Sequence, residues 1–304
     1  MWLINTATLR LHENPPSAVY AILSHTWEAE EVSFRDMEDL EKASKKKGFT
    51  KIVKACEIAH ASGIEWAWVD TCCIDKSSSA ELTESINSMW RWYKDAEICY
   101  AFLSDLPAAH SIVDPFLQRR ATFEHLKSCR WFTRGWTLQE LLAPTNIDLF
   151  DSSWKQRGTK ASLQYELSIL TGIHYDVLGD SRLIYQIPVA CRMSWAACRQ
   201  TTRDEDRAYS LFGIFDVNLP LIYGEGSKAF TRLQEAILQN STDLSIFAWD
   251  ANDDGQLYTG LLAGSPSDYA DCCGIRPCGT VTYERLSDIQ ITNKGIRQEV
   301  DLCI

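Results

Sequence analysis

The stretch Val19-Tyr-Ala-Ile-Leu-Ser24 is a compact apolar run, which is the pattern of a strand buried on both faces. Two similar runs follow it, Trp66-Ala-Trp-Val-Asp70 and Ile98-Cys-Tyr-Ala-Phe-Leu103, and Ile147-Asp-Leu-Phe150 is a fourth. Strands of this kind belong to parallel sheets whose two faces are both covered. Residues 19–150 therefore carry the pattern that decides the fold.

Helices are predicted between these strands. The apolar positions of residues 50–62 fall on one helical stripe, and residues 82–93 repeat this pattern. Ser78 and Glu81 have the spacing of a capping box at the start of the second helix. A third helix is predicted to begin near Thr133. The order β-α-β-α-β-α-β predicts an α/β fold with a parallel sheet flanked by helices.

Polar residues follow each of the four predicted strands, at the point where the strand ends. They are Ser24-His25, Asp70-Thr71, Ser104-Asp105 and Asp151-Ser152. Ligands of parallel α/β sheets bind beyond the carboxyl ends of the strands. The helix that carries Glu140 follows the third strand, so its start can face the same edge of the sheet. This shared edge is the physical argument for a functional role of Glu140.

Two interpretations of Glu140 follow from the stretch Ser128-Cys-Arg-Trp-Phe-Thr-Arg-Gly-Trp-Thr-Leu-Gln-Glu-Leu-Leu-Ala-Pro144. Trp136 and Glu140 are four residues apart and share one helix face, and a carboxylate beside an aromatic ring suits a cationic ligand. Alternatively, Thr137 is the N-cap and Glu140 folds back on the helix start as a capping box. A capping carboxylate faces its own helix start, whereas a catalytic one opens into a pocket.

The two ends of the chain are less regular. Residues 1–12 predict an opening strand or hairpin arm. Helices are predicted over residues 161–171, 194–199, 208–212 and 228–239. From Ser245 the pattern becomes β-like, and residues 288–292 and 298–302 are predicted to pair as a hairpin. We expect a core over residues 1–154 and a mixed α+β extension, packed on that core, over residues 155–304.

Composition excludes several classes of protein. A net charge of −11 over 304 residues argues against non-specific nucleic-acid binding. No apolar run reaches membrane-spanning length, and the N-terminus lacks the features of a signal peptide. Eleven cysteines, an odd number without a C-x-x-C pair, indicate reduced thiols. We therefore expect a cytoplasmic protein without a metal site or a membrane partner.

Several stretches of the chain resemble the fungal HET (heterokaryon incompatibility) domain. They are Tyr20-Ala-Ile-Leu-Ser-His-Thr-Trp27, Trp68-Val-Asp-Thr-Cys-Cys-Ile-Asp-Lys76, Trp131-Phe-Thr-Arg-Gly-Trp-Thr-Leu-Gln-Glu-Leu-Leu-Ala-Pro144, Arg192-Met-Ser-Trp195, Thr202-Arg-Asp-Glu-Asp206 and Tyr223-Gly-Glu-Gly226. The resemblance implies a role in fungal non-self recognition, where family members trigger cell death, usually as one domain of a larger receptor. It also implies activation by self-association, with an incompatibility partner that the sequence does not identify.

The HET family in turn resembles TIR domains, which carry a Trp-Cys-x-x-Glu-Leu motif on the helix after the third strand. Here the motif reads Trp136-Thr-Leu-Gln-Glu140-Leu141, with Thr137 in place of the usual cysteine. In enzymatic TIR domains the motif glutamate is essential for NAD cleavage, whereas many other TIR domains are only adaptors. The resemblance implies a TIR- or flavodoxin-like core, NAD as substrate and Glu140 as the catalytic residue.

The first functional hypothesis is an NAD glycohydrolase. Cleavage of the nicotinamide–ribose bond builds an oxocarbenium-like state, which a carboxylate beneath the sugar stabilises. The leaving group is already cationic, so the single carboxylate of Glu140 suffices. The candidate NAD-binding residues are Ser24, His25, Trp27, Asp70, Arg134 and Trp136. For four of them a structural role stays open: a loop hydrogen bond for His25, a turn cap for Asp70, a surface ion pair for Arg134 and core packing for Trp136.

Two other hypotheses belong to different classes. In a non-enzymatic assembly module the same edge of the sheet is an interaction surface and Glu140 is a helix cap. In a cysteine hydrolase, Cys72 or Cys73 pairs with His25 and an aspartate. Adjacent cysteines after a strand also pack as small hydrophobic residues, which is the structural alternative for this pair.

Overall fold

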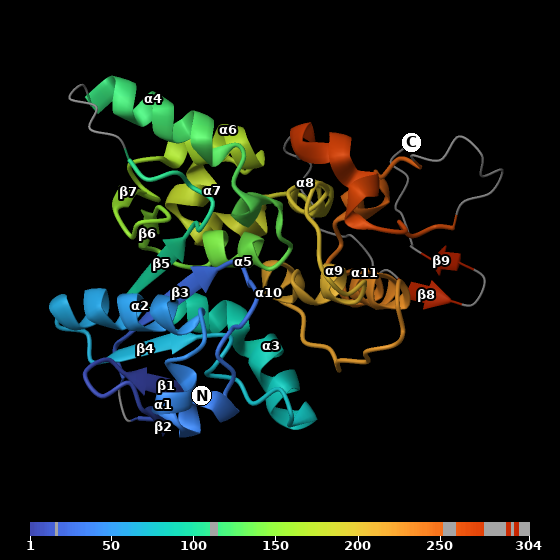
Figure 1. Ribbon diagram of the computed structural model, residues 1–304. Coiled ribbons are helices and arrows are strands. Elements are labelled where there is room, and N and C mark those ends of the chain that lie inside the picture. The colour runs from blue at the N-terminus through green and yellow to red at the C-terminus, as the bar shows by residue number, and fades with distance from the viewer. Residues whose placement is uncertain (16–17, 110–114, 252–259, 277–289, 293–294, 298–304) are drawn as a thin grey trace. The chain divides into compact units, whose positions relative to one another are not determined.

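The computed structural model describes residues 1–15, 18–109, 115–251, 260–276, 290–292 and 295–297. The chain divides into two compact units, Met1–Ser181 and Arg182–Ile304 (Figure 1). The sequence pattern predicts a division after residue 154, whereas the first unit here extends through residues 155–181.

The first unit is built on a seven-stranded sheet with the order β2-β1-β4-β3-β5-β6-β7. The strands are β1 Trp2–Asn5, β2 Leu11–Glu13, β3 Tyr20–His25, β4 Trp66–Val69, β5 Ile98–Phe102, β6 Ile147–Phe150 and β7 Gln156–Thr159. The four central strands β4-β3-β5-β6 are parallel, and β1 and β7 pair antiparallel at the two sides of this group. The α/β class, the four buried strands and the N-terminal hairpin are confirmed. The polar strand β7 is missed, because its sequence lacks an apolar run.

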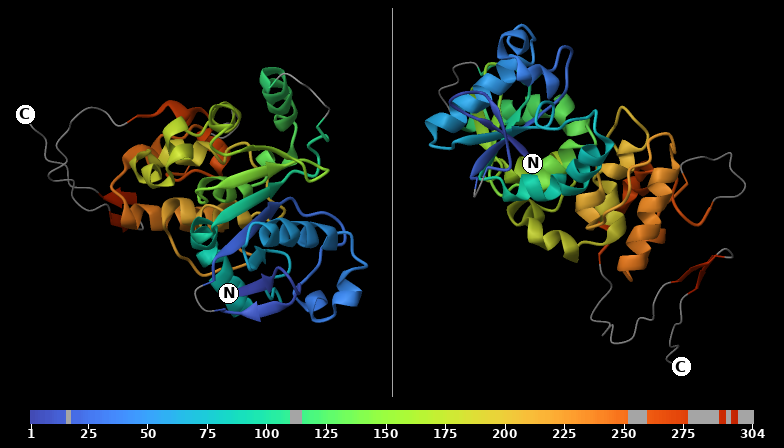
Figure 2. Two further views of the ribbon diagram at one scale, coloured as in Figure 1. Left: turned by 90° about the vertical axis from the view of Figure 1, so that its left-hand side faces the viewer. Right: turned by 90° about the horizontal axis from the view of Figure 1, so that it is seen from below.

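Helices cover the sheet of the first unit. They are α1 Leu40–Ala43, α2 Phe49–Ala61, α3 Ser79–Asp95, α4 Pro115–Leu126, α5 Thr137–Leu142, α6 Gln164–Thr171 and α7 Tyr175–Gly179, with 3-10 helices over Arg35–Glu38 and Arg130–Thr133. Figure 2 shows α2 and α3 on opposite sides of the strands. Every residue of β3 is buried, which is the expected result for a strand with both faces covered.

Aromatic packing fixes α3 against the sheet. The Trp68 ring of β4 meets the rings of Trp92 and Tyr93 on α3 edge-on, at centroid distances of 5.6 and 5.9 Å. The Tyr20 hydroxyl donates a hydrogen bond of 2.6 Å to the Trp92 carbonyl. As predicted, Ser78 is the N-cap of α3. Its partner Glu81 instead accepts from the Asp75 amide at 2.9 Å, so the cap also anchors the preceding loop.

The helix that carries Glu140 is shorter than the sequence predicts. A continuous helix from Thr133 is wrong, because residues Arg130–Thr133 form a separate 3-10 helix and α5 begins at Thr137. All six residues of α5 are buried, Glu140 included. The helix therefore lies in the interior of the first unit, and its polar side chains need internal partners.

The second unit is mostly helical over the residues that the structure describes. Its helices are α8 Val189–Ser194, α9 Asp206–Tyr209, α10 Phe212–Phe215 and α11 Lys228–Asn240, and 3-10 helices cover Ser181–Gln186, Leu244–Phe247 and Pro266–Gly274. The predicted helix over residues 228–239 is confirmed, and it buries Phe230, Leu233 and Ile237. The helix predicted over 194–199 is displaced toward the N-terminus, because α8 ends at Ser194.

The β-like pattern predicted from Ser245 onward is wrong for the described residues 245–251 and 260–274, which contain no strand and include the 3-10 helices Leu244–Phe247 and Pro266–Gly274. The buried Tyr269 hydroxyl donates to the Ile246 carbonyl at 2.7 Å and ties two of them together. The first arm of the predicted C-terminal hairpin is confirmed in β8 Gln290–Thr292, but its partner is β9 Gly295–Arg297, which begins inside the predicted turn. The predicted arm over residues 298–302 lies outside the described residues.

Candidate functional site

Glu140 lies at the carboxyl end of β3, in contact with side chains from other elements. The Ser24 hydroxyl at the end of β3 donates a hydrogen bond to Glu140 Oε2. The same hydroxyl oxygen accepts a 2.7 Å bond from Trp131 Nε1. The hydroxyl of Tyr93, from α3, donates to the Leu23 carbonyl at 3.3 Å and lies close enough to the Glu140 carboxyl group to lower its pKa. These four buried side chains form one polar network, which we call the Glu140 network.

The capping-box interpretation of Glu140 is wrong. The N-cap of α5 is Trp136, and no side chain caps this helix end. The Thr137 hydroxyl donates instead to the carbonyl oxygens of Trp131 and Arg134, and so it closes the turn before the helix. Glu140 is therefore directed to the strand end rather than to its own helix start.

Burial sets the protonation state of Glu140. The side chain is fully enclosed, and this desolvation raises its pKa, with a further contribution from the negative charge of Asp70. Hydrogen bonds from Ser24 and Tyr93 and the positive charge of Arg134 act in the opposite direction. The resulting pKa is about 8, so the carboxyl group is mostly protonated at neutral pH.

The Glu140 network lies where the strand order reverses. The chain runs from β3 to its neighbour β4 on one side and then returns to β5, which pairs with β3 on the other side. Ser24 lies opposite Ala101 and His25 opposite Phe102, at the carboxyl ends of β3 and β5. This reversal point is the usual ligand site of open parallel sheets. The expectation that Glu140 shares the strand-end edge is confirmed.

A second cluster lies beside this network and contains His25, Trp27 and Asp70. Trp27 Nε1 donates a 2.7 Å hydrogen bond to Asp70 Oδ2. The His25 ring is buried, with Nδ1 3.9 Å from Asp70 Oδ1 and Nε2 3.7 Å from Glu31 Oε2. Neither ring nitrogen makes a hydrogen bond to any residue in the described ranges, so the proposed structural loop bond of His25 is not found. Asp70 holds Trp27 instead of capping a turn.

Glu31 and Lys51 complete this cluster, and the sequence analysis misses both. Lys51 Nζ lies 2.5 Å from Glu31 Oε1 and donates to the Thr26 carbonyl at 3.3 Å. Burial alone would raise the pKa of Glu31, but His25 and Lys51 outweigh it and lower the pKa to about 2. Lys51 belongs to the buried stripe of α2, where a lysine gives no sequence signal for a site.

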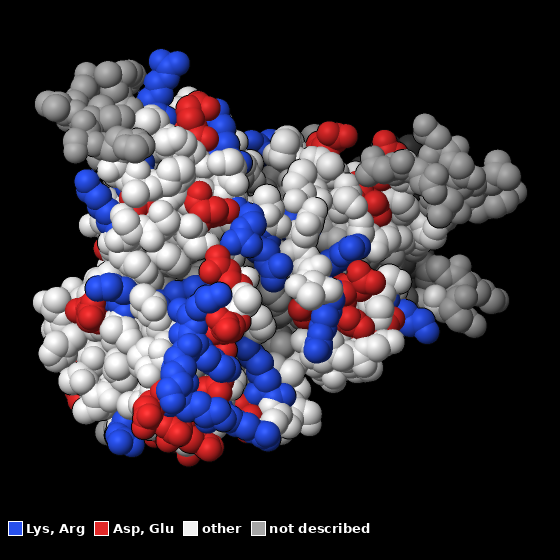
Figure 3. All heavy atoms as spheres, in the orientation of Figure 1, with Lys and Arg blue, Asp and Glu red and all other residues white. Residues whose placement is uncertain are grey.

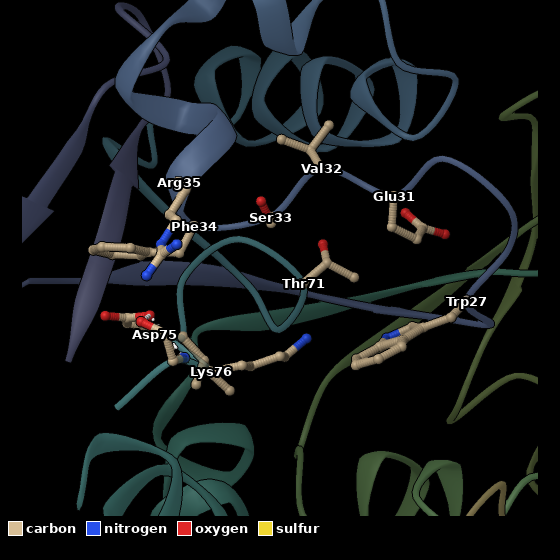
Figure 4. A pocket seen from close by; sticks show the side chains of 11 residues that line it. Trp27, Glu31, Val32, Ser33, Phe34, Arg35, Thr71, Asp75 and Lys76 are labelled. Atoms are coloured by element: carbon tan, nitrogen blue, oxygen red, sulfur yellow. Dashed lines mark hydrogen bonds between the residues drawn. The ribbon is translucent and has the colours of Figure 1, made fainter. Parts of the chain in front are cut away.

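A pocket of about 350 Å³ opens next to the second cluster (Figure 4). Residues 27–35, after β3, and residues 71–77, after β4, supply its walls. Trp27 is the one predicted site residue among its lining residues, and Glu140 is not among them. The Lys76 ammonium lies 3.7 Å from the centre of the Trp27 ring. The structure thus places Glu140 and this pocket on the same edge, linked through Trp27 and Asp70.

Arg134 and Trp136 are half-buried at the start of α5. Arg134 is close enough to lower the pKa of Glu140, which supports its place at the site. Trp136 is joined to Glu140 through its backbone, where its carbonyl accepts from the Glu140 amide at 3.5 Å. The sequence analysis also misses Trp131 and Tyr93 as partners of the network. In the sequence, Tyr93 shows only as part of the apolar stripe of residues 82–93, and such a stripe gives no indication of a hydrogen-bonding role.

The cysteine-hydrolase hypothesis receives no support from the geometry. Cys72 and Cys73 are buried, and their sulfur atoms contact the backbone of Val69. Burial raises the pKa of Cys72 well above its ordinary value, so the thiol stays protonated and unreactive. In the described part of the chain, no three metal-ligating side chains lie together, and no helix has the length and apolar character to span a membrane.

Comparison with known proteins gives two family matches and one curated relative. Residues 20–115 match the model of the heterokaryon incompatibility protein (HET) family, and residues 228–265 match a domain of unknown function, DUF8212. The chain is 49% identical over 221 residues to the vegetative incompatibility protein HET-E-1 of Podospora anserina. This similarity covers 72% of the chain but only 16% of that relative. No solved structure matches the chain.

Proposed function

The chain belongs to the heterokaryon incompatibility (HET) family, and from the Glu140 network we propose that it is a cell-death effector domain that hydrolyses the nicotinamide–ribose bond of NAD. The observation that carries this proposal is the position of Glu140. A buried carboxyl group with a strongly raised pKa lies at the point where the strand order of a parallel sheet reverses. Such perturbed groups concentrate at functional sites.

The topology supports a TIR- or flavodoxin-like core within this proposal. Numbered along the chain, the four parallel strands lie in the order second, first, third, fourth. This is the start of the flavodoxin-like order, whose ligand site lies outside the first and third strands. Glu140 reaches that position from the helix before the fourth strand, which is where the resemblance to TIR domains expects the motif glutamate.

In the proposed reaction, the carboxylate of Glu140 stabilises positive charge on the ribose as the bond to nicotinamide breaks. The bond electrons leave with the cationic ring, which departs as neutral nicotinamide. Water then adds to the ribose carbon and releases a proton to solvent. No acid is needed for the leaving group. Ser24 holds one carboxyl oxygen in place, so the group is oriented before the charge develops.

The raised pKa fits a cationic substrate. With the site empty, Glu140 is mostly protonated at pH 7. A nicotinamide cation beside it favours the carboxylate, because an opposite charge lowers the pKa of an acid. Arg134 acts in the same direction. In this proposal, substrate binding therefore releases the proton of Glu140 to solvent and generates the charged form that catalysis requires.

Access to Glu140 requires a change in structure. Its side chain is only 5% exposed, and it does not line the pocket beside Trp27. We propose that self-association of the domain opens this path in the cytoplasm, so that the isolated protein has low activity. One observation favours a non-enzymatic assembly module as the second candidate: each oxygen-binding partner of Glu140 is an internal side chain, as in a purely structural network.

NAD consumption by the purified chain tests the proposal, at concentrations that include those where it self-associates. Wild type is compared with Glu140→Gln and with the surface control Glu57→Gln, with folding checked by circular dichroism. We expect Glu140→Gln to lose at least about 100-fold in rate and the control to lose nothing. A folded, assembled wild type that consumes no NAD would establish the assembly module instead.

A further inference from the structure

The pocket beside Trp27 is lined by charged side chains of both signs. Lys76 and Arg35 line it together with Glu31 and Asp75, and the pKa of Asp75 is lowered by its hydrogen bonds from Ser77 and by the positive charge of Arg35. The two carboxylates have partners other than Lys76. Glu31 is paired with Lys51 at 2.5 Å, and Asp75 accepts hydrogen bonds of 2.6 and 2.9 Å from the hydroxyl and amide of Ser77.

The Lys76 ammonium lies over the face of the Trp27 ring. It lies 3.7 Å from the centre of the Trp27 ring, and Trp27 is in turn fixed by its 2.7 Å bond to Asp70. Figure 4 shows the ammonium extending from the loop after β4 toward the ring. Surrounding protein lowers the pKa of Lys76 through desolvation, and Asp70 only partly compensates. An anion beside this ammonium would raise its pKa, in the same direction as Asp70 does.

The remaining lining is apolar and suits a flat ring. Val32, Phe34 and Ile74 contribute to the walls, and the volume of about 350 Å³ falls in the range of small-molecule sites. On the face shown in Figure 3, Lys and Arg side chains also gather between α1 and α3, although the chain as a whole is acidic. The pocket therefore combines an anion-binding wall with an apolar wall.

From this combination we infer that the pocket binds a nucleoside monophosphate, with the phosphate at Lys76 and the base against Val32, Phe34 and Ile74. The link to Glu140 rests on the proposed function, in which this nucleotide is the adenylate half of NAD. Trp27 and Asp70 then lie between the nucleotide pocket and Glu140. Asp70 accepts a hydrogen bond from Trp27, which lines the pocket, and its charge raises the pKa of Glu140.

The inference is tested by titrating the full chain with AMP, with adenosine and with inorganic phosphate, using isothermal calorimetry. We expect AMP to bind at least tenfold more tightly than adenosine or inorganic phosphate, because AMP contacts both Lys76 and the apolar side of the pocket. Lys76→Met is expected to weaken AMP binding about tenfold while leaving adenosine binding unchanged. Lys54→Met, on the exposed face of α2 and paired with Glu57, is the matched control.

The outcomes separate this inference from the proposed function. AMP binding that is equal in wild type and Lys76→Met, or absent from wild type at millimolar AMP, would overturn the site. Glu140→Gln is expected to bind AMP like wild type, since Glu140 does not line the pocket. AMP binding without any NAD hydrolysis would keep the nucleotide site and reject the enzyme. If Lys76→Met hydrolyses NAD with an unchanged KM, only the assignment of the pocket to the adenylate half of NAD would be rejected.

Discussion

The Ser24 hydroxyl donates a hydrogen bond to the Glu140 carboxyl group across 116 positions of the chain. Ser24 is the last residue but one of the first parallel strand, and Glu140 lies on the helix before the last parallel strand. This bond joins a polar strand end to a polar position on a fully buried helix. Both residues are almost fully buried, so each depends on the other for hydrogen bonding.

Removal of the Ser24 hydroxyl is expected to destabilise the protein. In Ser24→Ala, Trp131 Nε1 loses its acceptor and Glu140 loses a donor inside the protein. Each unsatisfied buried group costs about 1–3 kcal/mol, so we expect a loss of about 2–4 kcal/mol in the free energy of unfolding. Urea denaturation measures this loss. The control Ser44→Ala, on an exposed helix end, is expected to change it by less than about 0.5 kcal/mol.

Stability is expected to fall as the pH rises from about 4.5 to 8. The pKa of Glu140 is about 8 in the folded state and close to 4.5 when unfolded, so in this window the folded state holds a proton that the unfolded state lacks. The loss is at most about 5 kcal/mol. The side chain in Glu140→Gln stays neutral, so the free energy of unfolding of this variant is expected to change little with pH in this window. A pH dependence as steep as that of the wild type would contradict the prediction.

The free energy of unfolding should be followed only up to about pH 8, because a second buried group affects its pH dependence above that pH. Lys160 Nζ donates to the carbonyl oxygens of Leu142 and Pro144, and burial lowers its pKa to about 8. Between pH 8 and the ordinary lysine pKa, the unfolded state holds the extra proton. Lys160 therefore raises stability with increasing pH there, which is opposite to the effect of Glu140 below pH 8.

Asp70 is expected to control the titration of Glu140. Its negative charge is the second cause of the raised pKa, after burial. Asp70→Asn keeps a side chain of the same shape, able to accept from Trp27 Nε1, but removes the charge. We expect the Glu140 midpoint to move to lower pH, as followed by carbon-detected NMR of the side-chain carboxyl. An unchanged midpoint would show that burial alone sets the value.

A structural carboxylate at the end of β6 provides a further test. Asp151 is fully buried and accepts hydrogen bonds from the amides of Ser153, Lys155 and Ala109, each at 3.0 Å. Asp151→Ala leaves these amides unsatisfied, and we expect a loss of about 3 kcal/mol or more in the free energy of unfolding. Asp176→Ala, at an exposed position, is the control. Equal denaturation midpoints for the two variants would refute this role.

The sequence alone determined the four parallel strands of the first unit and the helices α2 and α3 between them. Buried strands show as apolar runs whatever their partners are, because both faces of each strand must leave water. Helices α2, α3 and α11 show as stripes for the same reason. The sequence failed at β7, which is polar, and over residues 244–247 and 266–274, which form 3-10 helices.

Only the tertiary structure decided the role of Glu140. Locally, Thr137 and Glu140 have the spacing of a capping box, and that spacing gives no reason to prefer another partner. The folded chain brings Ser24 and Tyr93 to the carboxyl group and turns Thr137 toward the preceding carbonyl oxygens. The pKa of about 8 likewise arises from burial in the assembled interior, which no neighbouring residue in the sequence encodes.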